Sequence, residues 1–311
     1  MPEHYGAPVG SAYDLLQTDQ SLAAYVTGLR AREVTRLAID VEGENNLHAY
    51  GIHVALIQLF DGEHGAIVDV PAIRDRSLLR GLLEAAPWTL VWFDAANDLL
   101  SFQHALGIRP SPLRDLAIAA RLLGRQGGLH ALTGQPGSAA AKDKFQKSNW
   151  LRRPLSRALL DYAFSDVTHL LALDDTLRGE LSARGLLEQF AERNRAAQDA
   201  ERTWDPFANY VRIPGYHRLP PLKQRRARVL WYARELYGQQ ADLPPGNVAS
   251  KQDLRDLLDK DVGDARQIAE LLNRTRRNHR VREEDLRDSL AEAEARISAE
   301  KQVGTRQRRG R

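Results

Sequence analysis

Residues 37–59 read LAIDVEGENNLHAYGIHVALIQL, and this stretch decides the fold class. It opens with a short apolar run that ends in Asp40 and Glu42, and it closes with a second apolar run at residues 54–59. Gly51 lies between the two runs. Because short apolar runs bounded by turn residues are typical of β-strands, the stretch predicts two consecutive strands, the first of which ends in two carboxylates.

Outward from this stretch the pattern changes from strands to helices. A third apolar run at 66–70 follows the turn residues Gly62 and Gly65, and a fourth at 88–93 follows Pro87. Before residue 36 the apolar residues recur every three or four positions, as on an amphipathic helix, and after residue 93 the pattern is almost wholly helical. Strands that come first and later alternate with helices predict a mixed α/β domain.

A long amphipathic helix is predicted from Leu155 to near Gly185, because apolar residues recur there at helical spacing. The segment 126–149 before it contains glycines and lysines and predicts a loop. Residues 202–221 after it are rich in proline and have the composition of a linker. We therefore expect a first domain over residues 1–205.

The chain beyond the linker has helical periodicity. Helices are predicted at 222–237, 250–257, 264–272 and 283–299. The last six residues read RQRRGR. We expect a small helical domain over residues 206–300 and a basic, disordered tail over residues 301–311.

Composition excludes several classes of protein. The 311 residues are 43% hydrophobic and 27% charged, which is typical of a globular protein and not of a disordered or fibrous one. No run of about 18 apolar residues could span a bilayer, and the first residues lack a basic start followed by an apolar core. We therefore expect a cytoplasmic setting and no membrane contact. The sequence has no cysteine, so a metal would need oxygen or imidazole ligands.

Charge is divided unevenly along the chain. Residues 1–180 carry 17 Lys and Arg against 21 Asp and Glu, whereas residues 181–311 carry 27 against 20. An acidic first half suits carboxylates that bind cations, and a basic second half suits a polyanionic partner. An uneven drift of surface charge is the alternative interpretation.

Asp40 and Glu42 are the first candidate site residues. They are two positions apart on a strand and therefore project from the same face, where two oxygen ligands can reach one hard cation. An Asp-x-Glu pattern is expected about once by chance in a chain of this composition. Taken alone, the pair is a weak signal, because a solvated strand end is its ordinary explanation.

Two further patterns lie downstream. Asp98 falls in the first turn of a helix that Asp94 can cap, and an acid there also interacts favourably with the helix dipole. Tyr162 and Asp166 are four residues apart and lie on one face of the late helix. Each of these patterns also has an ordinary structural explanation. Only the order of all three along the chain is informative.

This ordered set resembles the DEDDy branch of the DEDD 3′–5′ exonucleases, and the ribonuclease D family in particular. Further similar stretches are RDLAIAARLLG at 114–124, FQKSNWLRRPL at 145–155 and LDYAFSDVTHLL at 160–171. The resemblance covers about residues 12–185. It implies a ribonuclease H-like mixed sheet flanked by helices. Phe93 departs from the family pattern, since many members carry a histidine five residues before the second-motif aspartate.

The resemblance implies a role for each candidate residue. Asp40, Glu42, Asp98 and Asp166 would hold two divalent ions, Mg²⁺ or Mn²⁺, and Tyr162 would align or help deprotonate the attacking water. Converging carboxylates repel one another unless cations neutralise them. Two ions can stabilise the attacking and leaving oxygens of an in-line displacement.

The resemblance also bears on substrate binding. His48 and Tyr50 could contact the terminal nucleotide, although they could equally be ordinary turn residues.

The second half contains the stretches YVRIPG at 210–215, LKQRRARVLWYARE at 222–235 and LPPGNV at 243–248. On these stretches residues 208–299 resemble the HRDC domain, which implies a small helical module that binds nucleic acid. Four basic residues of the helix predicted at 222–237 would offer charge to phosphates, namely Lys223, Arg225, Arg226 and Arg228. A solvated basic face is the alternative.

Together these features predict a metal-dependent 3′–5′ exoribonuclease that releases nucleoside 5′-monophosphates from RNA 3′ ends. The resemblance suggests transfer RNA precursors or other structured RNA as the substrate. An exonuclease that acts on DNA and a non-catalytic RNA-binding adaptor are the alternatives. A third hypothesis is that the second half chiefly binds protein partners.

Overall fold

The computed structural model describes residues 13–84, 86–133, 145–274 and 279–309, with side chains as far as residue 300. Contacts divide the chain into two compact units. The first comprises Met1–Glu44 and Ile52–Thr203, and the second comprises Asn45–Gly51 and Trp204–Arg311. We call them the sheet unit and the helical unit.

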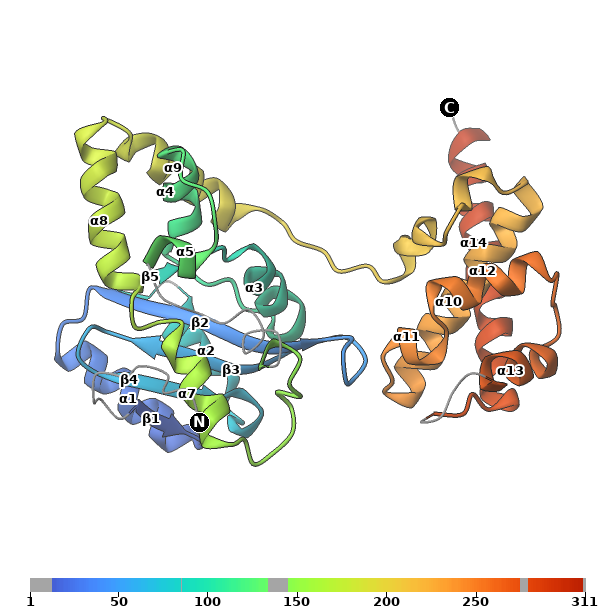
Figure 1. The fold of residues 1–311 in the computed structure, drawn as a ribbon, viewed down its shortest axis with the longest axis horizontal. Helices are drawn as coiled ribbons and strands as arrows, with labels where there is room; N and C mark the ends of the chain where they lie inside the picture. Colours follow the sequence, from blue (N-terminus) through green and yellow to red (C-terminus); the bar gives the residue numbers. More distant parts are fainter. Residues whose placement is uncertain (1–12, 85, 134–144, 275–278, 310–311) are drawn as a thin grey trace, which may run out of the picture. The chain divides into compact units, whose positions relative to one another are not determined.

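The sheet unit is built on one mixed sheet of six strands in the order β1-β4-β3-β2-β5-β6 (Figure 1). The strands are β1 (Tyr13–Leu16), β2 (Arg36–Asn45), β3 (Ile52–Phe60), β4 (Gly65–Asp69), β5 (Thr89–Trp92) and β6 (Leu113–Asp115). β3 pairs antiparallel with β4, whereas β1 with β4, β2 with β5 and β5 with β6 are parallel pairs. The prediction of a mixed α/β fold is confirmed.

The two edge strands differ from the sequence prediction. β1 lies in a region whose periodicity predicts a helix, and the helix α1 (Asp19–Ala31) begins only after it. β6 is three residues long and lies in a region that reads as helical. Strands this short show no period of their own, and each is defined by pairing with a strand that is distant in sequence.

Helices cover both faces of the sheet. On one face, α1, α2 (Arg76–Leu83) and α3 (Ala96–Ser101) pack with Leu37 and Ile39 of β2, and the π-helix η2 (Phe102–Leu106) follows α3. On the other face, α4 (Leu116–Leu122), α7 (Arg157–Ser165), α8 (Leu170–Ala183) and α9 (Leu187–Asp199) pack with Ala38. Alternation along β2 therefore directs Asp40, two residues after Ala38, towards the face of α7.

The single long helix predicted from Leu155 to near Gly185 is wrong. The structure has two helices, α7 and α8, separated by residues 166–169. Thr168 Oγ1 donates to the carbonyl oxygen of Ser165 at 2.9 Å, and the adjacent Val167 is also β-branched. Such local side-chain bonds compete with the helical ladder. The segment predicted as a loop contains α5 (Leu129–Thr133), and residues 134–144 lie outside the described ones.

The helical unit is organised around α10 (Pro221–Ala241), whose buried residues include Leu230, Trp231 and Tyr237. The surrounding elements are η3 (Phe207–Arg212), η4 (Tyr216–Arg218), α11 (Pro245–Val248), α12 (Lys251–Asp259), α13 (Ala265–Arg274) and α14 (Glu283–Arg309). Helix α14 continues into the segment predicted as a disordered tail, where Lys, Gln and Arg are good helix formers. No helix within the described ranges has the length and hydropathy of a membrane span.

Candidate active site

Asp40 and Glu42 lie on β2, and Asp98 lies in α3, which follows β5 closely. β2 and β5 are neighbouring parallel strands, with Arg36 opposite Thr89 and Ala38 opposite Val91. The carboxyl ends of parallel neighbours meet at the same edge of a sheet. Topology therefore brings the acids of β2 to the helix that carries Asp98.

Tyr162 lies on α7, and Asp166 is the residue that ends this helix. Helix α7 packs on β3 and β4. Gly65 makes this approach possible, because a Cβ atom there would lie 2.1 Å from Cζ of Phe164 on α7. A glycine on β4 thus seats the helix that supplies the tyrosine and the last aspartate.

Electrostatics shows that these acids affect one another. Burial raises the pKa of Asp40 well above its usual value, and the charges of Asp98, Asp166 and Glu42 raise it further. Burial, Asp166 and Asp98 raise the pKa of Glu42 to about 8. Because Coulomb interactions weaken with distance, the structure brings together four acids from three separate segments.

Asp98 has its own set of partners. Its pKa is raised to about 7, chiefly by burial and further by the charges of Asp94 and Asp115, while a hydrogen bond from Trp92 acts in the opposite direction. Trp92 Nε1 donates to Asp98 Oδ2 at 3.0 Å, and the Trp92 ring is fully buried. The sequence prediction missed Trp92, although an aromatic donor at the end of the preceding strand was visible in the sequence.

The turn between β5 and α3 is held by Asp115 of β6. Its carboxylate accepts from the backbone N–H groups of Asp94 at 2.8 Å and Ala95 at 3.3 Å, and also from that of Ala117 at 2.9 Å. Asp94 adopts a φ of 59° in this turn. The prediction that Asp94 caps the helix is wrong, because Ala95 is the N-cap residue and no side chain caps α3. Asp94 instead lies 3.7 Å from Arg121.

Aromatic side chains surround Tyr162. Phe145 stacks on its ring with centroids 4.8 Å apart, and Trp150 lies parallel to it at 6.4 Å. Trp150 is only 1% exposed and belongs to the core. Asp166 follows Tyr162 by one helix turn, and its Oδ1 lies 3.9 Å from Nε2 of His130 on α5.

The donor set suits a hard divalent cation. It consists of four carboxylates, and Mg²⁺ and Mn²⁺ prefer oxygen ligands. Divalent cations would also relieve the repulsion that raises the pKa of Asp40 and Glu42. In the described part of the chain, no three His, Asp or Glu side chains already form a group that could hold a metal ion. Binding of a cation by these carboxylates would therefore require them to rearrange.

Three of the four basic residues predicted to contact phosphate, namely Lys223, Arg226 and Arg228, form bonds inside the helical unit. Lys223 Nζ donates to the carbonyl oxygen of Leu258 at 2.9 Å. Arg226 Nη2 donates to the carbonyl oxygens of Val262 and Gly263 at 3.1 and 3.0 Å.

Arg228 and Arg225, the other two of these four residues, differ from each other. Arg228 Nη2 lies 2.5 Å from Glu300 Oε2, and its guanidinium lies over the ring of Tyr210. Arg225 is partly exposed and has no hydrogen bond or ion pair with another described residue. Of the four, Arg225 is therefore the residue whose side chain is most available to contact phosphate.

His48 and Tyr50 lie in the segment Asn45–Gly51, which clusters with the helical unit. His48 is exposed. The Tyr50 hydroxyl donates to Glu235 Oε2 at 3.4 Å, and the Tyr50 backbone N–H donates to Asp242 Oδ1 at 3.1 Å. Neither residue is brought to the four acids by an interaction described above, and their predicted contact with a nucleotide stays a prediction.

Comparison with known proteins gives a consistent picture. The model of a family described as 3′–5′ exonuclease matches residues 13–182. Ribonuclease D of Xanthomonas oryzae pv. oryzae is 33% identical over 225 residues, which are 70% of this chain and 60% of that protein. Ribonuclease D of Escherichia coli is 31% identical over 188 residues, which are 60% of this chain and 49% of that protein. These alignments thus span about half to 60% of the length of those two relatives.

Solved structures share the fold. The crystal structure of Escherichia coli RNase D, described as an exoribonuclease involved in structured RNA processing, has a TM-score of 0.70 and 25% sequence identity. The match covers 91% of this chain and 75% of that one. The catalytic core of RRP6 from Trypanosoma brucei has a TM-score of 0.76 at 21% identity and covers 95% of this chain and 82% of that one. The second likeness shows the fold alone.

Proposed function

Because the chain belongs to the 3′–5′ exonuclease family, in its ribonuclease D branch, we propose that it removes nucleotides from the 3′ ends of RNA. The products would be nucleoside 5′-monophosphates. The observation that carries this proposal is that the charges of Asp98 and Asp166 both raise the pKa of Asp40 and of Glu42, inside the segment that matches the family. Acids that only capped separate helices or faced solvent would not raise one another's pKa values in this way.

We assign the four acids as ligands of two divalent cations, with Mg²⁺ or Mn²⁺ as the occupants. When bound, such cations stabilise charge on the attacking and leaving oxygens of an in-line displacement. Asp40 and Glu42 would offer oxygens from one strand face, and Asp98 and Asp166 would offer theirs from the ends of two helices. Trp92 would hold one oxygen of Asp98 in a fixed orientation.

Tyr162 would act on the attacking water. Its hydroxyl, one helix turn before Asp166, would orient the water towards the last phosphodiester or help remove its proton. The new bond joins the water oxygen to phosphorus, and the bond to the 3′-oxygen of the penultimate nucleotide breaks. That oxygen leaves as the new 3′-hydroxyl of the shortened RNA.

The two relatives reported above are named ribonucleases, and this supports RNA rather than DNA as the substrate of this chain. The neighbour described as acting in structured RNA processing supports structured 3′ ends, such as those of transfer RNA precursors, as the substrate class. The basic helical unit, proposed as the domain over residues 206–300, would contact the phosphates of such an RNA. A catalytically inactive adaptor is disfavoured because all five site residues are present.

The test is a degradation assay on 5′-end-labelled RNA and DNA of the same sequence, with and without Mg²⁺. We expect a ladder that shortens from the 3′ end of RNA only when Mg²⁺ is present. Asp40→Asn should abolish the ladder, and Glu192→Gln, an exposed acid of α9, should leave it unchanged. Degradation by Asp40→Asn at the wild-type rate would contradict the assigned site, and absence of degradation under all metal conditions would contradict the proposed activity.

A further inference from the structure

Arg153 lies on the loop before α7, and all three nitrogens of its guanidinium donate hydrogen bonds to other residues of the sheet unit. Nε lies 3.0 and 2.9 Å from the two carboxylate oxygens of Asp69, and Nη2 lies 2.6 Å from Asp69 Oδ1. Nη2 also donates to the carbonyl oxygen of Ala55 at 3.3 Å. Nη1 donates to the carbonyl oxygens of Trp150 at 2.5 Å and Arg152 at 3.1 Å.

Asp69, at the end of β4, is itself held in place by burial and by a second hydrogen bond. It is 4% exposed, and Gln17 Nε2 donates to its Oδ2 at 3.1 Å. Two-pronged arginine–carboxylate pairs fix orientation as well as distance. Asp69 precedes Arg153 by 84 residues in sequence, so the pair fastens the backbone at Trp150 to β4, and the bond to Ala55 adds β3.

The fastened residue lies beside the proposed catalytic tyrosine. The planes of the Trp150 and Tyr162 rings differ by 25°, and those of Phe145 and Tyr162 differ by 26°. Trp150 is 1% exposed and belongs to the core, where close packing resists a rotation of the ring on a fixed backbone. The backbone carbonyl of Trp150 is the group that Arg153 holds.

We propose that the Arg153–Asp69 pair is a positioning device for Tyr162. It fixes the Trp150 backbone, the Trp150 ring limits the tilt of the Tyr162 ring, and the tyrosine hydroxyl is thereby held where the attacking water must lie. The reason for such a device is geometric, because a displacement of about 1 Å at a reacting group can cost about a hundredfold in rate. The inference rests on the proposed function only for the role of the hydroxyl.

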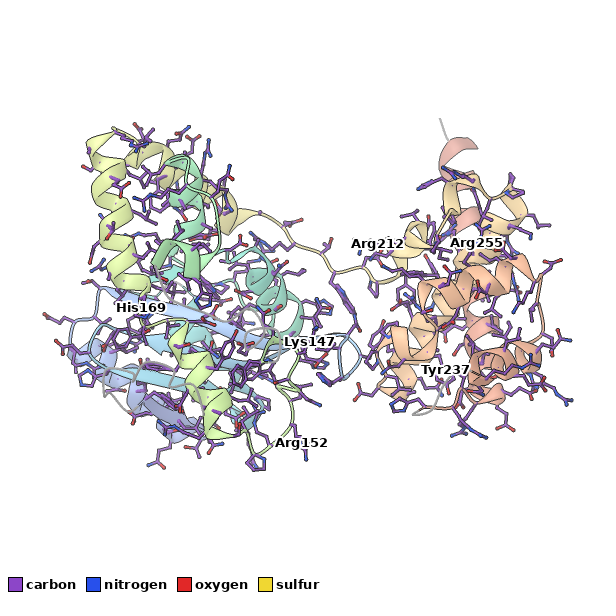
Figure 2. All side chains as sticks on the ribbon, in the orientation of Figure 1. Lys147, Arg152, His169, Arg212, Tyr237 and Arg255 are labelled. Carbon is purple, nitrogen blue, oxygen red and sulfur yellow. The ribbon has the colours of Figure 1, made fainter. Side chains whose placement is uncertain are left out.

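The alternative is that the pair stabilises the fold and does nothing specific for Tyr162. The variant Arg153→Lys distinguishes a general stabilising role from a role in positioning Tyr162. Lysine keeps the charge opposite Asp69, but its single nitrogen cannot replace the planar fork that also reaches Trp150 and Ala55. The exposed neighbour Arg152, labelled in Figure 2 on the loop that leads into α7, has no side-chain hydrogen bond or ion pair within the described residues and provides the matched control, Arg152→Gln.

The first measurement is a double-mutant cycle on kcat. We expect Arg153→Lys to lower kcat about tenfold in the wild-type background, with KM nearly unchanged, and to lower it about twofold or less in a Tyr162→Phe background. Arg152→Gln should leave kcat unchanged. An equal loss in both backgrounds, or no loss in the wild-type background, would overturn the proposal.

The second measurement does not depend on activity. In protein labelled with 3-fluorotyrosine, the ¹⁹F resonance that disappears in Tyr162→Phe belongs to Tyr162. Arg153→Lys should move this resonance, because the ring currents of Trp150 and Phe145 change with the tilt of Tyr162, and Arg152→Gln should not. A resonance that stays in place in folded Arg153→Lys would overturn the proposal. If that variant does not fold, Asp69→Asn serves in both measurements with the same expectations.

These outcomes separate the two claims. Wild-type protein without nuclease activity would contradict the proposed function, and the ¹⁹F spectra would still decide whether Arg153 positions Tyr162. An active wild type with additive mutations would contradict the positioning role alone.

Discussion

Glu42 and Asp98 are the residues whose ionisation depends most clearly on what surrounds them. Their pKa values are raised to about 8 and about 7, above the unfolded values of about 4. Folding therefore favours their protonated forms. Their stabilising contribution is fully present below about pH 4 and is lost as the pH rises through these folded values.

This predicts a pH-dependent stability for the metal-free protein. Its Tm should fall between pH 5 and pH 9, and Asp98→Asn should reduce that fall, because the amide carries no charge to repel Asp40. Added Mg²⁺ should raise the Tm of the wild type at pH 8 and raise that of Asp98→Asn much less. Thermal unfolding followed by circular dichroism measures this, with Glu192→Gln as the control, and a wild-type Tm that rises steadily over this range would contradict it.

The hydrogen bond from Trp92 to Asp98 should strengthen metal binding. Trp92→Phe keeps a buried ring but removes the donor to Asp98. Loss of a hydrogen bond to a metal ligand typically weakens metal binding by about 10- to 100-fold. The Mg²⁺ concentration for half-maximal activity should rise by about tenfold.

Trp88→Phe is the matched control for Trp92→Phe. Trp88 is equally buried, but its Nε1 donates to the carbonyl oxygen of Leu82 at 3.1 Å. It should lower stability and leave the Mg²⁺ requirement unchanged. Equal shifts in the Mg²⁺ requirement for both variants would mean that the hydrogen bond of Trp92 is unimportant.

At the scale of elements, the short turn from β5 into α3 depends on Asp115. A buried carboxylate that accepts three backbone N–H groups cannot be replaced by an amide, which has one acceptor oxygen. Asp115→Asn should lower the free energy of unfolding by about 1–3 kcal/mol and weaken Mg²⁺ binding, because the turn carries Asp98. Urea unfolding and Mg²⁺ titration measure the two effects.

Asp75→Asn gives the comparison for Asp115. Asp75 is an exposed N-cap of α2 that accepts from Ser77, and asparagine is about as good an N-cap as aspartate. The free energy of unfolding should change little, and Mg²⁺ binding should not change. A loss of Mg²⁺ binding in Asp75→Asn but not in Asp115→Asn would contradict the role of the turn.

The elements also show what the sequence could and could not predict. The inner strands β2 to β5 were predictable because each is an apolar run between turn residues. Edge strands β1 and β6, and the break between α7 and α8, depend on partners and local bonds that periodicity does not record. The order of Asp40, Glu42, Asp98, Tyr162 and Asp166 along the chain makes them candidates, whereas the bonds of Arg153 and Asp115 to distant segments are visible only in the structure.

At the scale of the whole molecule, positive charge gathers in the second half of the sequence, but much of it has an internal role. Arg226 holds the chain between α12 and α13, whereas its neighbour Arg225 has no such bond. Arg225→Gln should reduce the slope of log K against log salt for RNA binding by up to about 1. Arg226→Gln should chiefly lower stability.

Fluorescence anisotropy of labelled RNA at several salt concentrations measures these slopes, and Tm values measure the stability of each variant. Lys260→Gln, an exposed cation at the end of α12, is a control for loss of one charge in the same unit. If Arg226→Gln changed the salt slope while leaving the Tm unchanged, its bonds to the backbone would be unimportant. The predicted phosphate contacts of α10 would then be favoured.

The proposed activity requires that the four acids bind two cations. A crystal of the wild-type protein soaked in Mn²⁺ and measured at the manganese absorption edge tests this requirement. We predict two anomalous peaks about 4 Å apart, each within bonding distance of oxygens from Asp40, Glu42, Asp98 or Asp166. Manganese bound elsewhere, with no peak within bonding distance of these carboxylates, would contradict the assignment of the four acids.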